Sequence, residues 1–219
     1  MNRTLFKQID KAREEQREVM ETKMNMNEWK NLKPYWTYVD MDGVIADFFG
    51  ALAKEFGVQH WKDIPTQQDV IDRITGTDFF YKIRIFPTTV MFLHMVERYT
   101  QGRWSILSTP LKGDEENSSK QKDRWLDGVF SYAFDNDFNK ERTYTHEKWR
   151  YATRPVFPSG RARTLLIDDR PQNLELFRNP PKENLKIDGW AGHTIRYQAN
   201  ESNMGKFENK LKELFTSNE

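Results

Sequence analysis

The chain has 219 residues, and 37% of them are hydrophobic, including 15 Phe and 7 Trp, which is enough for the core of one domain with or without a small insert. Its 34 Lys and Arg residues balance 33 Asp and Glu residues, so no overall basic field favours binding to nucleic acid or to a membrane surface. The sequence has no cysteine, which excludes disulfides and thiolate metal sites.

The N-terminal segment, residues 1–33, contains no Gly or Pro, and its apolar positions recur at roughly helical spacing. This pattern predicts one long, charged helix, which would either dock on the core or serve as the arm of a homodimer. We favour docking, because the apolar stripe is interrupted at Gln16 and is too short for a heptad seam. The segment is too charged for a signal peptide, and no stretch of the chain resembles a membrane helix, so we expect a cytoplasmic protein without a membrane partner.

Three apolar runs have the composition of buried strands: YWTYV (35–39), WSIL (104–107) and TLLI (164–167). Helical patterns separate the first two runs, and the clearest of them lie at residues 47–56 and 88–99. Strands that alternate with helices predict an α/β fold built on a Rossmann-like, doubly wound parallel sheet.

The stretch from about residue 49 to 86 is longer than one crossover helix requires. We therefore expect a small, mostly helical cap insert beside the sheet of a main domain that spans residues 34–219. HTIRY (193–197) predicts a further strand, and MGKFENKLKELF (204–215) predicts a closing amphipathic helix.

Polar residues capable of chemistry follow each of the three predicted strands: Asp40 and Asp42, Ser108 and Thr109, and Asp168 and Asp169. In an open parallel sheet, ligands bind beyond the carboxyl ends of the strands. If these strands are neighbours, all six side chains converge there. Either aspartate pair alone could be an ordinary turn or helix cap, but the three sets together predict a site.

Up to four carboxylates in one pocket require a cation, because like charges repel and burial disfavours each charged form. No His or Cys lies near them in the sequence, so we expect a hard ion with oxygen ligands, Mg²⁺. Asp40, held at the end of its strand, can act as a nucleophile, and Asp42 can serve as general acid and base. Gly43 allows a sharp turn, and the hydroxyls of Ser108 and Thr109 can hold phosphate oxygens.

Four segments in order resemble the motifs of the haloacid dehalogenase superfamily of phosphohydrolases: DMDGVIADF (40–48), ILSTP (106–110), a later lysine and LLIDDRP (165–171). The most similar branch is that of the 5'(3')-deoxyribonucleotidases, with their phage and bacterial relatives. KDRW (122–125) is similar to the lysine–x–x–tryptophan element of that branch. The resemblance covers residues from about 35 to 200, and the first 33 residues lie outside it.

The resemblance implies a role for each matching position. Asp40 would be the nucleophile and Asp42 the acid/base, and Ser108 would supply the phosphate-binding hydroxyl, with Thr109 beside it in the reverse of the usual order. Phe48 falls where an aromatic ring of the branch stacks on the nucleobase, whereas most other insert aromatics are interpreted as the insert's own core. The implied ligands of Mg²⁺ are Asp40, the backbone carbonyl of Asp42, and one or both of Asp168 and Asp169.

The family also uses a lysine that neutralises charge between the nucleophile and the phosphate. Lys148, in HEKWRYA, matches the lysine just before a short helix. Its separation of 20 residues from Asp168 is longer than typical, and PVFPSGRAR (155–163) looks like an inserted loop. Lys122, in KDRW, is the second candidate, so we predict both lysines as phosphate-binding residues.

We therefore expect an Mg²⁺-dependent phosphatase that hydrolyses (deoxy)ribonucleoside monophosphates, its small-molecule substrates, through an aspartyl-phosphate. The alternative is a polynucleotide 3'-phosphatase, because residues 140–163 are locally basic and could follow a nucleic-acid backbone. A second alternative is a non-catalytic interaction module of the same fold that binds through the N-terminal helix. The intact aspartates favour an enzyme over that module.

Overall fold

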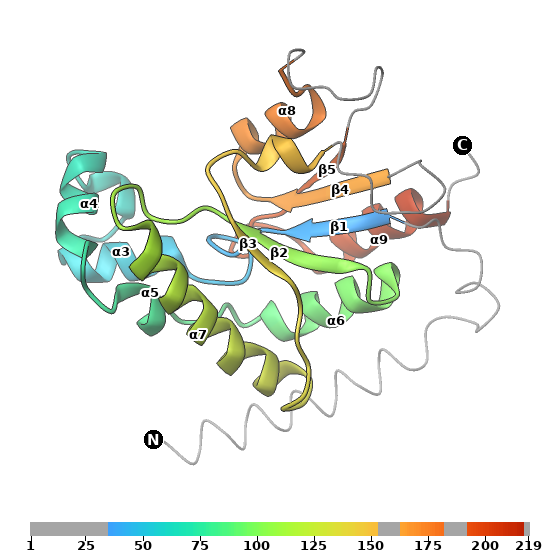
Figure 1. Cartoon of the computed structure of the whole chain (residues 1–219), viewed down its shortest axis with the longest axis horizontal. Coiled ribbons are helices and arrows are strands. Elements are labelled where there is room, and N and C mark those ends of the chain that lie inside the picture. The colour runs from blue at the N-terminus through green and yellow to red at the C-terminus, as the bar shows by residue number, and fades with distance from the viewer. Residues whose placement is uncertain (1–34, 153–162, 182–191, 217–219) are drawn as a thin grey trace.

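A computed structural model describes residues 35–152, 163–181 and 192–216 of the chain. Within these residues, five parallel strands form one sheet in the order β3-β2-β1-β4-β5 (Figure 1). The strands are β1 (Tyr35–Val39), β2 (Trp104–Ser108), β3 (Arg142–Tyr144), β4 (Arg163–Asp168) and β5 (His193–Arg196). The helix predicted for residues 1–33 lies outside the described residues, as does most of the loop predicted at 155–163.

The described helices form two groups (Figure 1). Those between β1 and α6 form a small insert beside the sheet, and the others pack on the sheet domain. In chain order they are α3 (Phe48–Phe56), the 3-10 turn η1 (Trp61–Asp63), α4 (Gln67–Ile74), α5 (Phe79–Lys82), α6 (Thr89–Thr100), α7 (Glu115–Ala133), the 3-10 turn η2 (Lys148–Tyr151), α8 (Pro171–Arg178) and α9 (Met204–Thr216). The first four occupy the stretch in which the sequence predicts a helical insert.

Side chains of the central strands are buried on both faces of the sheet. On one face, Tyr38, Leu107 and Leu166 pack with residues of α8 and η2. On the other face, Val39 and Ile106 belong to a core that includes residues of α6, α7 and α9. Helices therefore cover both faces, and the doubly wound α/β fold predicted from the sequence is confirmed (Figure 1).

Capping residues set the ends of the insert helices. The carboxylate of Asp47 accepts a hydrogen bond from the amide of Gly50 at 3.0 Å and starts α3. That helix ends at Gly57, which adopts the left-handed conformation with φ +66°. The hydroxyl of Thr66 accepts from the amide of Asp69 at 3.1 Å and starts α4.

The insert joins the sheet domain through two chain segments that pair with each other. Ala46 and Ile85 form an antiparallel bridge, and the amide of Asp47 donates to the carbonyl of Arg84 at 2.9 Å. In Figure 1 the arrowheads of β1 and β4 point towards the insert, so the insert stands beside the carboxyl ends of the strands. This is the edge at which the sequence predicts a site.

Most of the predicted elements have counterparts in the structure. The apolar runs at 35–39, 104–107 and 164–167 correspond to β1, β2 and β4, and the strand predicted at 193–197 corresponds to β5. The sequence did not predict β3, a three-residue edge strand of half-buried polar side chains that pairs with β2. Its brevity and polarity explain why it lacks the signal of a buried strand.

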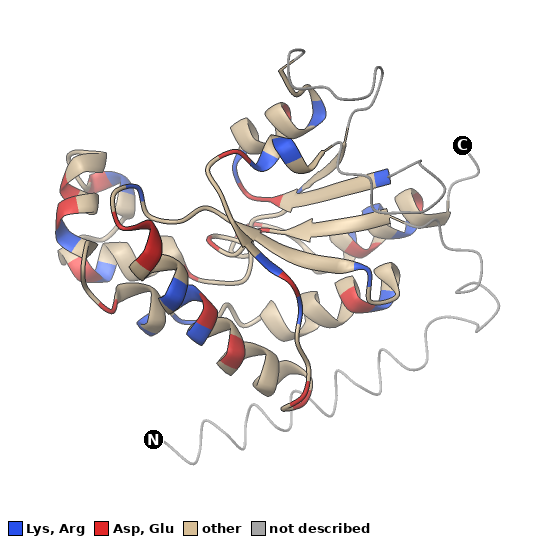
Figure 2. Cartoon of the chain, in the orientation of Figure 1, with Lys and Arg blue, Asp and Glu red and all other residues tan. Residues whose placement is uncertain are grey.

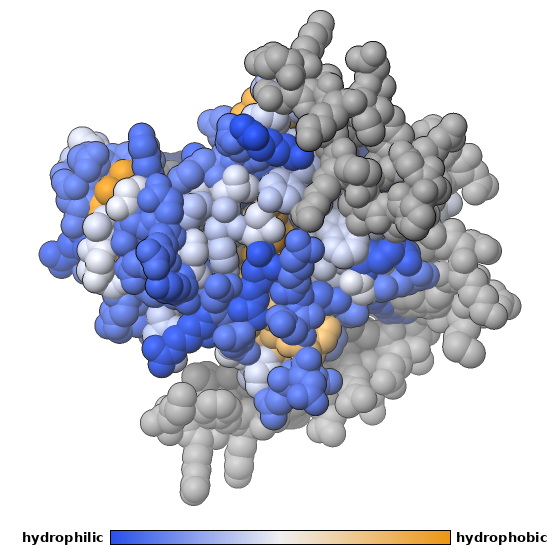
Figure 3. Space-filling view, in the orientation of Figure 1, coloured by the Kyte–Doolittle hydropathy of each residue, from blue (hydrophilic) through white to orange (hydrophobic). Residues whose placement is uncertain are grey.

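The face of the molecule shown in Figure 3 is largely hydrophilic, and its apolar residues form small, separate patches. Among the described residues, the large hydrophobic side chains that are exposed are Trp61, Tyr81 and Leu176. No helix in the described ranges has the length and apolar character needed to cross a membrane.

Candidate active site

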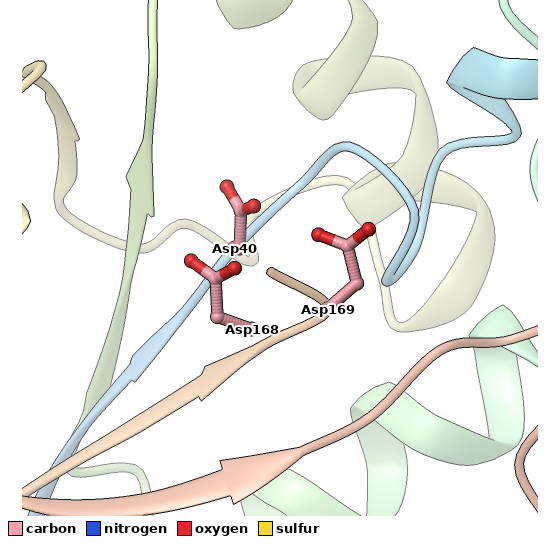
Figure 4. A group of neighbouring side chains, drawn as sticks. All are labelled: Asp40, Asp168 and Asp169. Carbon is pink, nitrogen blue, oxygen red and sulfur yellow. The ribbon is translucent and has the colours of Figure 1, made fainter. Parts of the chain in front are cut away.

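Three aspartates meet at the carboxyl ends of β1 and β4 (Figure 4). Asp40 follows β1, Asp168 is the last residue of β4, and Asp169 comes next. The two strands are neighbours, and the amide of Asp40 donates to the carbonyl of Ile167 at 2.9 Å. All three aspartates are buried, and carboxylate oxygens from each lie within 4.8 Å of one another, so the group could hold a metal ion.

Lys148 places a buried ammonium group against two of these carboxylates. Its Nζ lies 2.8 Å from Oδ1 of Asp40 and 2.7 Å from Oδ2 of Asp168. The lysine belongs to η2, which packs against α8. The long separation of Lys148 from Asp168 in the sequence therefore does not prevent a position beside the predicted nucleophile.

Asp168 and Asp169, which are adjacent in the sequence, have different hydrogen-bond partners. Asp168 accepts hydrogen bonds from Lys148, from the amide of Arg170 at 2.8 Å and from Nδ2 of Asn173 at 2.9 Å. Asp169 Oδ1 is buried and has no hydrogen-bond partner among the residues that the structure describes. Because a buried carboxylate oxygen without a donor is unfavourable, Asp169 has the stronger need for a cation.

The electrostatics of the group are dominated by burial. Burial raises the pKa of Asp40 to about 6, the attraction of Lys148 opposes this effect, and the charges of Asp168 and Asp42 add to it. Burial also raises the pKa of Asp169 to about 8, and the charges of Asp40 and Asp168 contribute in the same direction. Burial alone would lower the pKa of Lys148, but attraction to Asp40 and Asp168 raises it, so the ammonium stays charged. The group thus has three carboxylates and one lysine, which pairs with two of them, and this excess of negative charge favours a bound cation.

A tight turn after β1 carries Asp42 and Gly43. Gly43 has φ +80°, and a Cβ atom at this position would lie 2.6 Å from Oδ2 of Asp169. The amide of Gly43 donates to the carbonyl of Ala46 at 2.9 Å and closes the turn. The sharp turn predicted at Gly43 is therefore present, and a site carboxylate occupies the space that a larger side chain would need.

Lys122 projects from α7 into the site and is fully buried. Its Nζ lies 2.6 Å from Oδ2 of Asp42, 3.0 Å from the hydroxyl oxygen of Ser108 and 2.7 Å from the carbonyl oxygen of Thr109. The serine thus presents its hydroxyl to the lysine, whereas the threonine presents its carbonyl. The ammonium also stands over the ring of Phe80, 4.8 Å from its centroid.

The structure divides the predicted metal-binding aspartates into two sets. Asp40, Asp168 and Asp169 form the compact group, whereas the carboxylate of Asp42 pairs with Lys122. This division is compatible with the prediction that Asp42 offers only its backbone carbonyl to the metal, which stays a prediction. The side chain of Asp42 is 21% exposed, which is compatible with the proton exchange predicted for it, and that role stays a prediction.

Phe48, the predicted base-stacking residue, belongs to an aromatic cluster of the insert. Its ring stacks on Phe80 with centroids 6.0 Å apart, and it meets Phe49 and Phe79 edge-on at 5.4 and 5.8 Å. Phe79 and Phe80 are buried, as expected of the insert's core, whereas Phe48 is half-buried. The contact of Phe48 with a nucleobase stays a prediction.

The basic segment at 140–163 is divided among separate ion pairs. Four of its side chains pair in different places: Lys140 with Glu97, Arg142 with Asp127, Lys148 with Asp40 and Arg150 with Glu147. Arg154 and Arg161 lie outside the described residues. Figure 2 shows acidic residues interspersed with basic ones along the described chain. The described part of this segment therefore gives no support to a continuous basic track.

Sequence analysis did not identify Asn173, the amide of Arg170 or Phe80 as parts of the site. The signal for Asn173 was present, because Pro171, one residue beyond the aspartate pair, starts a helix whose first turn carries residue 173 close to the strand end. Phe80 had no local signal, since its contact with Lys122 depends on how the insert packs on α7.

Comparisons of the chain with protein-family models and with curated proteins find no match. The resemblance of its motifs to the haloacid dehalogenase superfamily therefore stays a prediction, and a function must be argued from the residues and their geometry.

Proposed function

We propose that the chain is an Mg²⁺-dependent phosphomonoester hydrolase of the haloacid dehalogenase type that acts on nucleoside monophosphates. One observation carries the proposal: buried carboxylates and two buried lysines meet at one edge of the sheet. A phosphate dianion bound together with a metal ion matches this mixture, because the metal takes the carboxylates and the lysines take the phosphate oxygens. A metal ion alone would bring no anion to the lysines, and a phosphate alone would bring no cation to the carboxylates.

The carboxylates fit a hard divalent cation. Asp40 and Asp169 would hold it with the backbone carbonyl of Asp42 and water, because Asp168 already accepts three hydrogen bonds. The donor set consists of oxygen atoms, which favours Mg²⁺ over softer metals. When bound, such an ion supplies positive charge next to the phosphate oxygens.

The proposed reaction proceeds through two displacements. In the first, a carboxylate oxygen of Asp40 forms a bond to phosphorus as the ester P–O bond breaks, and Asp42 gives its proton to the leaving oxygen. In the second, Asp42 takes a proton from a water molecule whose oxygen attacks the phosphorus of the aspartyl-phosphate. The acyl P–O bond breaks, phosphate leaves and the carboxylate of Asp40 is restored.

Both lysines support this chemistry. Lys122 and the hydroxyl of Ser108 would donate to phosphate oxygens, because they already lie together beside Asp42. Lys148 orients Asp40, and its attraction limits the rise in the pKa of that carboxyl to about 6. At neutral pH the nucleophile is therefore mostly ionised, as attack on phosphorus requires.

The insert favours a nucleotide over a smaller phosphate ester. The ring of Phe80 faces the ammonium of Lys122 and also stacks on Phe48, so the aromatic cluster begins at the proposed phosphate site. Aromatic side chains stack on bases with about 1–3 kcal/mol each and with little base preference. A nucleoside attached to the phosphate would thus have an aromatic surface within its reach.

A phosphate-release screen tests the proposal. It compares 5'- and 3'-mononucleotides with a 3'-phosphorylated oligonucleotide, with Mg²⁺, at low and moderate salt. We expect the mononucleotides to be the better substrates, with a shallow salt dependence because each makes one main phosphate contact. A large preference for the oligonucleotide with a steep salt dependence would favour the polynucleotide phosphatase instead, and release from none of them would favour the interaction module.

A further inference from the structure

The tryptophan of the KDRW segment has no role in the proposed reaction, yet it lies on the helix that presents Lys122. The start of α7 faces residues 76–83 of the insert, here called insert segment 76–83. The side chains that contact the segment are three or four positions apart in the sequence, so they lie on one face of the helix. These residues are Asp114, Asn117, Gln121 and Trp125, and each forms a hydrogen bond with the backbone of the segment.

Trp125 and Gln121 make the contacts closest in sequence to Lys122. The indole N–H of Trp125 donates to the carbonyl of Ile83 at 2.7 Å, and this bond is buried. Gln121 binds the segment in both directions, because its Nε2 donates to the carbonyl of Thr77 and its Oε1 accepts from the amide of Tyr81 at 3.4 Å. The two residues therefore hold both ends of the segment.

The segment held in this way also covers the lysine. Phe80 lies between Thr77 and Ile83, and its ring faces the ammonium of Lys122 at 4.8 Å. Lys122 is fully buried and also contacts Asp42 and Ser108. Release of the segment from α7 would remove the aromatic cover from Lys122 while leaving the sheet in place.

We propose that Trp125 and Gln121 are positioning residues that hold insert segment 76–83 and Lys122 as one unit. The phosphate site and the aromatic cluster then lie at a fixed separation before the substrate binds. A substrate that contacts both would lose less free energy to the ordering of protein segments on binding. The effect of this positioning on substrate binding rests on the proposed function. The coupling between the segment and Lys122 is a property of the fold and does not depend on that function.

Selective acylation of lysines in the unliganded full-length protein, read by mass spectrometry, tests the coupling. The double variant Gln121→Leu/Trp125→Phe removes three hydrogen bonds and keeps apolar packing. We expect acylation of Lys122 to rise about tenfold, because local opening becomes easier as these bonds are lost. Lys148 is the internal control, since it is also buried but pairs with Asp40 and Asp168 outside the segment, and its acylation should stay within about twofold.

Two further variants keep the test decisive. Gln121→Leu alone changes a half-buried position and leaves the hydrogen bond of Trp125 in place, and we expect a smaller rise at Lys122 in the same direction. Lys120→Ala is the matched control, because Lys120 pairs with Glu116 on the exposed side of α7, and it should leave Lys122 protected. Unchanged labelling of Lys122, or an equal rise at Lys122 and Lys148, would overturn the proposal.

Steady-state kinetics provide a second test, because a general loss of stability would not raise KM while leaving kcat unchanged. With a nucleoside monophosphate, we expect the double variant to raise KM severalfold with kcat nearly unchanged, because uniform binding is lost. A fall in kcat with unchanged KM would contradict the positioning role. If the wild type hydrolyses no nucleotide, the proposed function fails, and the labelling comparison still decides whether the segment and the lysine are coupled.

Discussion

At the residue scale, Asp40 and Asp169 are the groups whose ionisation folding disturbs most clearly. Their ordinary pKa is 3.8, and burial raises it to about 6 for Asp40 and about 8 for Asp169. The folded chain therefore keeps protons that the unfolded chain releases. The corresponding contribution to stability is fully present below pH 3.8 and is lost as the pH rises through about 6 and about 8.

The melting temperature of the protein in EDTA should consequently fall between pH 5 and pH 8.5. Asp169→Asn should flatten this fall, because the amide does not ionise, and saturating Mg²⁺ should flatten it in the wild type by binding the ionised carboxylates. Thermal unfolding at several pH values measures both effects. An identical pH dependence in the wild type and in Asp169→Asn would contradict this account of the cluster.

Gly43 connects backbone geometry with the site. Gly43→Ala should destabilise the fold by about 2 kcal/mol or more, because an L residue is strained at φ +80° and its Cβ would meet the carboxylate of Asp169. Gly113→Ala is the matched control, since Gly113 has φ +84° but a Cβ there meets no atom within 4 Å in the described structure. Denaturant unfolding should therefore show the larger loss for Gly43→Ala, and equal losses would show that the approach of Asp169 is unimportant.

At the scale of elements, Phe48 of α3 packs in the aromatic cluster of the insert and is also the residue that we propose to stack on the nucleobase. Phe48→Ala should destabilise the protein by about 2 kcal/mol, because a half-buried ring is removed from its contacts with Phe49, Phe79 and Phe80. It should also lower kcat/KM for nucleoside monophosphates severalfold and leave hydrolysis of a small aryl phosphate nearly unchanged. Equal losses with both substrates would assign Phe48 to the core alone.

The strands show which elements local sequence can predict. β1, β2 and β4 are buried on both faces, so each is an apolar run followed by a polar residue at the strand end. β3 lies at the edge and consists of Arg142, Thr143 and Tyr144, whose composition does not differ from that of a loop. The positions of Asp40 and Asp168 follow from the strand ends, and for this reason they could be predicted before the structure was known.

At the scale of the whole molecule, the contacts of the site depend on how distant segments pack. The sequence could not decide between Lys122 and Lys148, and the structure places both in the site with different partners: Asp42 and Ser108 for the first, Asp40 and Asp168 for the second. Likewise, the basic segment is continuous in the sequence, but its described side chains point to separate partners. The partners of these side chains are determined by tertiary packing, and the spacing of residues in the sequence does not predict them.

The central claim is that Asp40 is the nucleophile of a phosphatase. The most direct test measures release of inorganic phosphate from deoxynucleoside monophosphates, with Mg²⁺, by the wild type and by Asp40→Asn. We predict turnover by the wild type and a loss of at least about a thousandfold in the variant, because an amide cannot form the acyl-phosphate. The melting temperature of the unliganded variant should not fall, since one of several crowded negative charges is removed. Wild-type turnover by a folded Asp40→Asn protein would contradict the account.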